Sequence, residues 1–236
     1  MEIKIWKKPK NATIVEGFPG FGLVGTITTE FLVDHLDVEL IGKVIMEESP
    51  AVVAIHEDHI VEPLGIFYNK KYNLVIVHAV SASTGVEWKL SDMIVKLAKD
   101  LGAKEIISLE GVGSSATKLD TDKVFYFTKN NKKSKLKKMG LNPLKEGIIM
   151  GVTGALLLNT EKVPLSCIFA ETHSQLPDSK AAARVIKILG NYIGLKIDTS
   201  PLMKQAEKFE GKLKGLLAKG EEAKGMAESK RPNYFG

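Results

Sequence analysis

Short apolar runs alternate with amphipathic stretches along most of the chain. Runs rich in β-branched, aromatic and other apolar residues predict strands at 12–15, 38–45, 52–55, 60–68, 74–80, 105–109, 124–128, 148–150 and 164–170. Apolar residues at helical spacing predict helices at 24–35, 86–101 and 182–193, and a short apolar helix after 151–154. Strands that alternate with helices indicate an α/β fold around a largely parallel sheet, with mixed or antiparallel short strands between 38 and 80.

Glycine-containing turns follow three of the predicted strands, at 17–25, 111–115 and 151–154. The carboxyl ends of parallel strands meet at one edge of a sheet, and ligand sites of open α/β proteins form at that edge. We therefore take five glycines of the first two turns as candidate ligand-binding residues: Gly20, Gly22, Gly25, Gly111 and Gly113.

The first turn has the glycine spacing of a nucleotide-binding loop but little else of one. Gly20 to Gly25 has the G-x-G-x-x-G spacing after a strand, and Glu39 stands about where the acidic residue of that motif is expected. The turn lacks the lysine and hydroxyl of a phosphate-binding P-loop, and Pro19 with two phenylalanines indicates an apolar turn. Dinucleotide binding is therefore disfavoured.

The last part of the chain has a different pattern. Its apolar residues alternate in spacing between four and three, which is a heptad seam: Leu202, Ala206, Phe209, Leu213, Leu216, Gly220, Ala223 and Ala227. Glycines in the same stretch each cost a helix about 1 kcal/mol relative to alanine, so this helix needs a partner. It can fold back on its own domain, pair with another subunit, or project as an arm.

We accordingly divide the chain into an α/β core domain, 1–198, and a helical arm with a docking tail, 199–236. Four residues of the arm are the expected contacts with other subunits or with client proteins: Leu202, Phe209, Leu213 and Leu216.

Composition narrows the class of protein. The chain is 44% apolar and 26% charged, as in an ordinary globular protein. Its net charge of +5 gathers in 118–138 and 201–236, but the lysines of 132–138 are typical of a solvated surface, and nucleic-acid binding is not favoured. The single cysteine, Cys167, the charged N-terminal residues and the absence of a long apolar run predict a cytoplasmic protein without a membrane segment.

No catalytic or metal-binding pattern stands out. Ser114, Ser115 and His173 lack a G-x-S-x-G elbow and an ordering acid. His56 and His59 do not have the spacing of a zinc motif, and positions three apart in extended chain fall on opposite faces. We expect no metal, no cofactor and no enzyme activity.

Three stretches together resemble the archaeal branch of the proteasome assembly chaperone 2 family. They are 17–25 (GFPGFGLVG), 109–115 (LEGVGSS) and 171–178 (ETHSQLPD), the last followed by an alanine-rich helix. The resemblance implies a three-layer α/β sandwich similar to the phosphorylase/hydrolase-like fold, with a protruding C-terminal helix. It also implies an ATP-independent, homo-oligomeric chaperone, of roughly three to five subunits, that binds proteasome α-subunits.

Some members of that family dock on the proteasome through a C-terminal hydrophobic-Tyr-any tripeptide. Here Tyr234 takes the hydrophobic position, Phe235 the tyrosine position and Gly236 the last position. Phe235 lacks the hydroxyl of the family's tyrosine. The resemblance implies that the terminal carboxylate pairs with a lysine between α-ring subunits while the aromatic rings fill a pocket. A paralogue and unfolded proteins are further partners that it suggests.

The alternative hypothesis is a small-molecule-binding enzyme of phosphorylase-like or ATP-grasp-like type that uses the turns at 17–25 and 111–115. The two hypotheses differ in one structural expectation. An enzyme needs a cavity with convergent polar groups at these turns, whereas turns packed against Phe18 and Phe21 without a cavity would exclude it.

Overall fold

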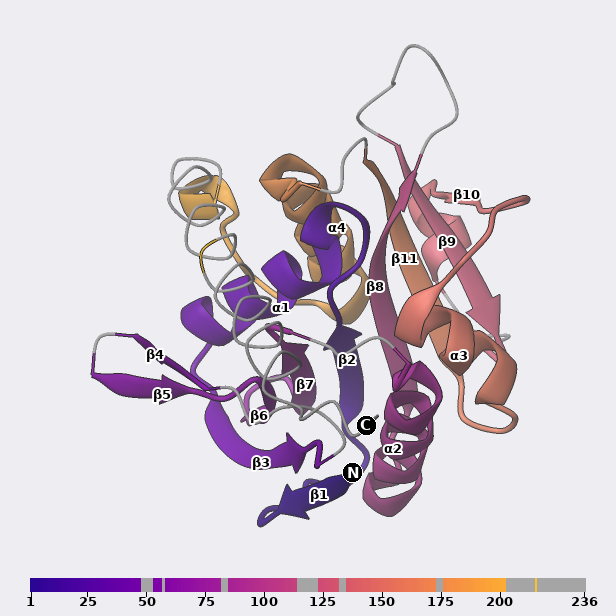
Figure 1. Cartoon of the computed structure of the whole chain (residues 1–236). Helices are drawn as coiled ribbons and strands as arrows, with labels where there is room; N and C mark the ends of the chain where they lie inside the picture. The colour runs from indigo at the N-terminus through magenta and orange to yellow at the C-terminus, as the bar shows by residue number, and fades with distance from the viewer. Residues whose placement is uncertain are drawn as a thin grey trace, which may run out of the picture.

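The computed structural model of the chain describes residues 1–47, 53–56, 58–81, 85–113, 123–131, 135–172, 176–202 and 215. A nine-stranded sheet runs through the centre of the molecule (Figure 1). In spatial order its strands are β1 (Glu2–Ile5), β3 (Glu39–Ile45), β6 (Leu64–Asn69), β7 (Leu74–Ala79), β2 (Thr13–Gly17), β8 (Glu105–Gly113), β11 (Leu165–Thr172), β9 (Val124–Lys129) and β10 (Asn142–Pro143).

The sheet is mixed. Its four central strands, β7, β2, β8 and β11, run parallel to one another, and β10 runs parallel to β9. The other neighbouring pairs are antiparallel. The α/β class is thus confirmed, and so is the prediction of mixed or antiparallel strands between 38 and 80. The expectation of a largely parallel sheet holds for the centre, whereas the antiparallel pair of β11 with β9 was not predicted.

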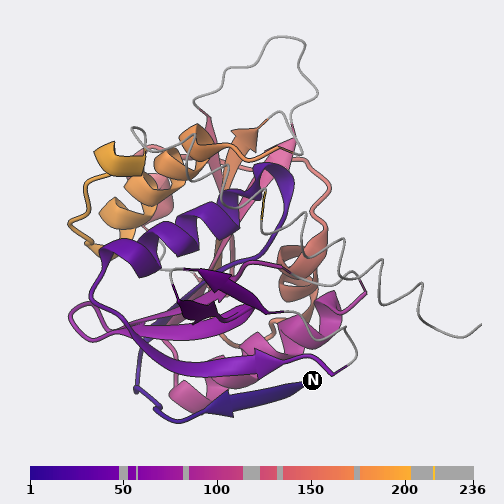
Figure 2. The same ribbon diagram turned by 60° about the vertical axis from the view of Figure 1, so that its left-hand side comes forward.

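Helices cover both faces of the sheet (Figure 2). Helices α1 (Val24–His35) and α4 (Ser179–Ile193) contact each other over one face, and α2 (Glu87–Leu101) and α3 (Gly151–Asn159) contact each other over the opposite face. Successive residues of β2 show the alternation, because Ile14 packs in the core under α2 and α3 while Val15 packs in the core under α1. The central strands are buried on both sides, which explains their nearly continuous apolar sequences.

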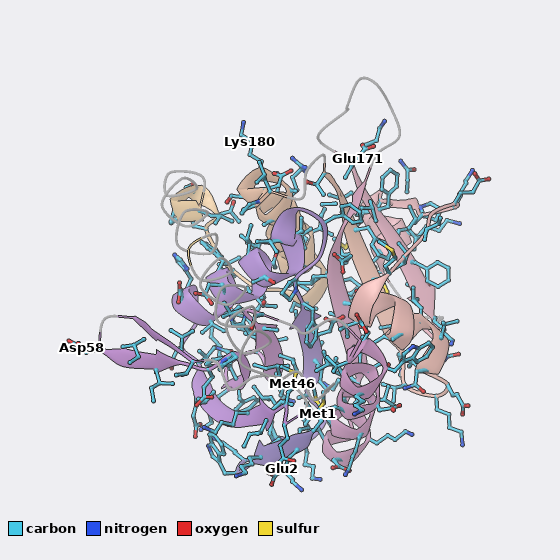
Figure 3. All side chains as sticks on the ribbon, in the orientation of Figure 1. Met1, Glu2, Met46, Asp58, Glu171 and Lys180 are labelled. Carbon is cyan, nitrogen blue, oxygen red and sulfur yellow. The ribbon has the colours of Figure 1, made fainter. Side chains whose placement is uncertain are left out.

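Smaller elements complete the described part. The single-turn 3₁₀ helices η1 (Phe21–Leu23) and η2 (Leu136–Met139) precede α1 and β10. A separate two-stranded sheet, β4 (Ala54–His56) with β5 (His59–Val61), forms a hairpin that projects from the body, with Asp58 at its tip (Figures 1 and 3). Its register pairs His56 with His59, so the expectation that these residues lie on opposite faces is wrong.

Two other sequence predictions differ from the structure, and one strand was not predicted. The run 60–68 is divided between β5 and β6 around Pro63, which has no backbone N–H for a sheet ladder. Residues 148–150 form no strand and instead lead directly into α3. Strand β1 was not predicted; it is an edge strand whose exposed and half-buried residues alternate, so it lacks an apolar run.

Beyond Leu202, Gly215 is the sole described residue. The rest of the predicted arm and tail, 203–214 and 216–236, lies outside the described residues, as do Ser114, Ser115 and His173. Among the helices that are described, none has the length and apolar character needed to cross a membrane.

The chain leaves β2 and β8 in different ways at the carboxyl ends of these strands. β2 leads into α1 on one face of the sheet, whereas the chain after β8 goes on to β9 in the same sheet. Helix α3, which begins beside the end of β8, lies on the other face. Elements on opposite faces thus flank the carboxyl ends of two adjacent parallel strands, and ligands of open α/β sheets bind outside such ends. We call the space at the ends of β2 and β8 the switch point.

The backbones of β2, α1 and β8 lie in close contact at this switch point. A Cβ atom on Gly17, the last residue of β2, would lie 2.1 Å from the carbonyl oxygen of Gly25 in α1. A Cβ atom on Gly25 would lie 2.4 Å from the carbonyl oxygen of Leu109 in β8. Neither separation accommodates a side chain, so the first turn of α1 is seated directly on β2 and β8 because both positions are glycine.

The Gly25→Ala variant tests this packing. We expect the free energy of unfolding to fall by about 1–3 kcal/mol, because a methyl group must displace backbone rather than a flexible side chain. Chemical denaturation measures the change. The control is Gly113→Ala, where the nearest atom to an added Cβ is Phe21 Cε1 at 3.9 Å and the expected change is within about 0.5 kcal/mol. Equal stability of the two variants would contradict the packing argument.

Candidate functional site

Two glutamates are buried at the carboxyl ends of β2 and β8, on the face covered by α3. Glu16 is 1% exposed and Glu110 is 8% exposed. Both lie on the same face of the sheet, because Glu16 pairs with Ser108 and Glu110 is two residues beyond Ser108. Buried carboxyl groups without a cationic partner are uncommon, so this pair marks a candidate functional site.

Hydroxyl groups link the two carboxyls. The Ser108 side chain hydrogen-bonds to Glu16, and Ser108 Oγ lies 2.9 Å from Thr153 Oγ1 of α3. The Thr153 hydroxyl donates to Glu110 Oε2 at 3.3 Å. Glu16, Ser108, Thr153 and Glu110 thus form one continuous hydrogen-bonded chain. Within the described residues, Glu16 Oε1 has no hydrogen-bond partner.

The glycine turn closes over Glu110. The backbone N–H of Gly111 donates to Glu110 Oε1 at 3.1 Å, and the backbone N–H of Phe21 also hydrogen-bonds to this carboxyl. Gly20 packs so closely that a Cβ atom there would lie 2.0 Å from Glu110 Oε1. A side chain at position 20 would therefore displace the Glu110 carboxyl.

Burial makes both carboxyls weak acids. Desolvation raises the pKa of Glu16 to about 8, against a smaller lowering by the Ser108 hydroxyl. Desolvation is also the largest cause that raises the pKa of Glu110 to about 8, and the neighbouring Glu16 charge raises it further. The hydrogen bonds from Gly111, Thr153 and Phe21 act in the opposite direction. The same surroundings raise the pKa of the buried Cys167 thiol, so this cysteine is not a thiolate nucleophile.

A cavity of about 310 Å³ opens beside this pair at the switch point. Three segments line it, residues 19–21 after β2, 110–113 at the end of β8, and 148–151 at the start of α3. Phe18 is buried in the core, whereas Phe21 is 38% exposed and lines the cavity. The turns therefore do not pack shut against their phenylalanines.

The candidate glycines serve two different purposes. Gly20, Gly111 and Gly113 line the cavity. Gly25 instead permits the contact between α1 and β8 described above, and Gly22 has a left-handed φ of 61° at the turn into α1. The backbone N–H of Asp178 donates to Gly22 O at 2.8 Å and so fixes this turn to the start of α4.

Leu202, an expected contact with other subunits or clients, is 2% exposed and packs in a core cluster with Leu23, Ile27 and Phe31. Its side chain is an intramolecular contact with α1 and the residues just before it. Phe209, Leu213, Leu216, Tyr234, Phe235 and Gly236 lie outside the described residues.

A second buried polar cluster joins α1 to β7. His78 Nδ1 lies 2.8 Å from the Thr29 hydroxyl, and His78 Nε2 lies 2.7 Å from Glu30 Oε2. All three residues are buried and none lines the cavity, so this cluster ties the helix to the sheet. In the described ranges, no three His, Cys, Asp or Glu side chains are grouped so as to hold a metal ion.

The functional residues that the sequence analysis missed are Glu16 and Glu110. The signal was present, since both strands contain an apolar residue, glutamate and glycine in succession at or near their carboxyl ends: Val15-Glu16-Gly17 and Leu109-Glu110-Gly111. A glutamate at the end of a buried strand, repeated at two strands that become neighbours, indicates a shared polar site at one sheet edge.

Comparison with known proteins places the chain in a family. Residues 14–217 match the model of the PAC2 family. The chain belongs to the PAC2 family. The resemblance inferred from the turns at 17–25, 109–115 and 171–178 is thereby confirmed.

Solved PAC2-like structures share the fold. The structure of PbaA from Pyrococcus furiosus, described as an archaeal homolog of proteasome-assembly chaperone, has 32% identity and a TM-score of 0.82, covering 94% of this chain and 99% of that chain. The structure of PbaB from the same organism, described as an archaeal proteasome activator, has 19% identity and a TM-score of 0.72 over 91% of this chain and 98% of that chain. An uncharacterized protein of Methanocaldococcus jannaschii is 27% identical over 95% of this chain and 90% of its own length.

Replacing Glu16 by glutamine tests the weak-acid character of the pair. Glu16 has an ordinary pKa of 4.5, which its burial raises to about 8 in the folded state. The folded state therefore holds a proton that the unfolded chain releases between these values, and the stability that this proton provides is lost as the pH rises. We expect the free energy of unfolding of Glu16→Gln, relative to the unsubstituted chain, to increase by roughly 2–4 kcal/mol between about pH 5 and pH 8.

Urea denaturation at several pH values measures this difference. The matched control is Glu146→Gln, the same chemical change at an exposed position. A pH dependence that is equal for the two variants would show that Glu16 is ionised in the folded protein at neutral pH.

Proposed function

We propose that this PAC2 family protein is an ATP-independent, chaperone-like protein that binds the α-ring of the proteasome. The observation that carries the proposal is the likeness to PbaA, which extends over nearly the whole of both chains at 32% identity and a TM-score of 0.82. Its function is binding rather than catalysis, and we expect it to act in the cytoplasm. Assembling or unfolded proteins and a paralogue are further candidate partners.

The proposed docking element is the C-terminal tripeptide, Tyr234, Phe235 and Gly236. Its chemistry suits a pocket between two subunits. The terminal carboxylate supplies one negative charge for a lysine, and two adjacent aromatic rings supply apolar area at a low cost in side-chain entropy. Phe235 fills the space of the family's tyrosine without donating its hydrogen bond.

Homo-oligomerisation is the second part of the proposal, and the β4–β5 hairpin is the described surface that best fits a contact between copies. Ile55 and Ile60 pair across the hairpin and are 73% and 66% exposed. The adjacent Val53 is 56% exposed. A two-stranded hairpin with an apolar face is marginal in water on its own and is stabilised by packing against another surface.

The alternative, an enzyme of phosphorylase-like or ATP-grasp-like type, keeps one supporting observation, the cavity at the glycine turns. Its lining residues include no lysine or arginine among those described, and Glu110 is their only ionisable side chain. A triphosphate needs cations or a metal ion to neutralise it, so this cavity disfavours ATP as the ligand.

Removing Tyr234-Phe235-Gly236 tests the docking element. We expect the truncated chain to keep its own oligomeric state in native mass spectrometry and to lose its complex with the proteasome of the same organism. A matched control adds one glycine after Gly236, which keeps both rings but displaces the carboxylate, and it should also abolish the complex. Phe235→Tyr should bind roughly two- to tenfold more tightly, because it restores one hydrogen bond. Undiminished binding of the truncated chain would contradict the proposal.

The double variant Ile55→Asn, Ile60→Asn tests the oligomer contact. We expect light scattering to show a shift from the oligomer toward a smaller species, because two amides replace an apolar pair that would be buried between copies. Leu158→Asn on α3 is the control, since Leu158 is 70% exposed and lies on another element. An unchanged mass for the hairpin variant would place the contact elsewhere, and a monomeric unsubstituted chain would refute the oligomer.

A further inference from the structure

The cavity at the switch point combines an acid with apolar walls, and the proposed docking on the proteasome involves none of its lining residues. Its floor is a buried carboxyl group, Glu110, and its described walls are apolar or backbone. Phe21 is the one aromatic side chain among the described lining residues, and Val112 and Ile149 are half-buried aliphatic neighbours. An anion site would present cationic or N–H groups instead of a carboxyl group, and a purely apolar cavity would have no carboxyl group.

We propose that this cavity binds a small organic cation, an ammonium group on an apolar body about one ring in size. The ammonium contacts the Glu110 carboxylate, and the apolar body lies against Phe21, Val112 and Ile149. The proposal is independent of proteasome binding, because it involves no residue of the C-terminal tail.

Charge selects the cation. A carboxylate pairs with an ammonium, and the face of an aromatic ring attracts the same charge. Among the described lining residues no cationic side chain is present to occupy Glu110 or to attract an anion. A ligand carboxylate or phosphate in this place would be partly desolvated without a cationic partner among the described lining residues, which is unfavourable.

Size limits the apolar body. The cavity volume of about 310 Å³ is at the lower end of the range for small-molecule sites. An amine with one aromatic ring or a short alkyl chain fits this volume. The apolar residues Ile148 and Met150, which also line the cavity, are 89% and 62% exposed, so the entrance is open and apolar.

Proton release accompanies the proposed binding. Burial raises the pKa of Glu110 to about 8, so the empty cavity holds a neutral carboxylic acid at neutral pH. An arriving ammonium keeps its own protons and favours the carboxylate, and the Glu110 proton leaves to solvent. No covalent bond to carbon forms or breaks. Binding is therefore expected to strengthen as the pH rises toward about 8 and to release up to one proton.

The groups facing Glu110 act on the same proton. On β2 the facing group is Glu16, whose charge opposes ionisation of Glu110. On β11 it is the buried Cys167 thiol, and on α3 the Thr153 hydroxyl donates to Glu110 Oε2. The turn at 19–21 contributes the backbone N–H of Phe21, which favours the carboxylate. The hydroxyls of Ser108 and Thr153 connect Glu16 to Glu110 and supply a hydrogen-bonded path for the proton of Glu16.

Three probes of one shape separate charge from size: phenethylamine, the neutral 2-phenylethanol and the anionic 3-phenylpropionate. Isothermal titration calorimetry and methyl NMR are carried out on the full chain. We expect phenethylamine to bind about tenfold more tightly than 2-phenylethanol, to shift the methyl signals of Val112, Ile148 and Ile149, and to release protons in buffers of different ionisation enthalpy. We expect no binding of 3-phenylpropionate.

Two variants and a matched control complete the test. Glu110→Gln removes the charge and should reduce phenethylamine affinity about tenfold and abolish the proton release. Gly113→Val adds bulk beside Phe21, because an added Cβ lies 3.9 Å from Phe21 Cε1, and it should weaken the amine and the alcohol alike. Glu105→Gln is the control: it lies on the opposite face of β8, where Tyr192 hydrogen-bonds to it, and it should leave binding unchanged.

Several results would overturn the proposal. Equal affinity for phenethylamine and 2-phenylethanol would show that the charge of the ligand does not contribute to binding. Equal amine affinity in Glu110→Gln and in the unsubstituted chain would remove the role of Glu110. Methyl shifts confined to residues outside the cavity, or no amine binding at millimolar concentration in a chain that is folded by NMR, would remove the site itself.

Discussion

The close approach of three backbone segments at the carboxyl ends of β2 and β8 is the constraint from which the rest of the site follows. Gly17, Gly25 and the Leu109 carbonyl come so close that no side chain fits between them. This contact seats α1 on the sheet and directs the intervening turn across the end of β8. The turn then packs Gly20 onto Glu110, and it brings the N–H of Phe21 to the same carboxyl.

That geometry explains why two acids tolerate burial. Glu16 and Glu110 are buried, so they lose most of their water but gain hydroxyl and backbone donors. The result is a pair of largely protonated acids rather than two buried charges, since desolvation outweighs the hydrogen bonds in setting the pKa of each. A neutral acid at the edge of a cavity is stable when the cavity is empty and becomes a charge when a cation arrives. The protonated state of Glu110 thus affects both the stability of the fold and the binding of the proposed ligand.

The α/β class and most of the elements were predictable from the sequence, because the central strands are apolar and the helices are amphipathic. The glycine turns were also recognised, and Gly20, Gly111 and Gly113 do line a cavity. The position of 148–150 was not predictable, because an apolar run of three residues suits a strand or a cavity wall equally. The proximity of Glu16 to Glu110 was missed because, although both glutamates stand between an apolar residue and a glycine, their proximity depends on β2 and β8 becoming neighbours, which is a long-range contact. Leu202 fitted a heptad seam, yet it packs against α1, since apolar spacing does not specify which surface a helix covers.

Two roles are thus proposed for this PAC2 family protein: docking through its C-terminal tripeptide, and cation binding in the cavity that has an acid at its floor. The central claim is that this acid pair is neutral at physiological pH. Carbon-13 NMR of the glutamate carboxyl carbons, with signals assigned through Glu16→Gln and Glu110→Gln, measures it directly. We expect both carboxyls to titrate near pH 8. Titration of both near the ordinary glutamate value of 4.5 would contradict it.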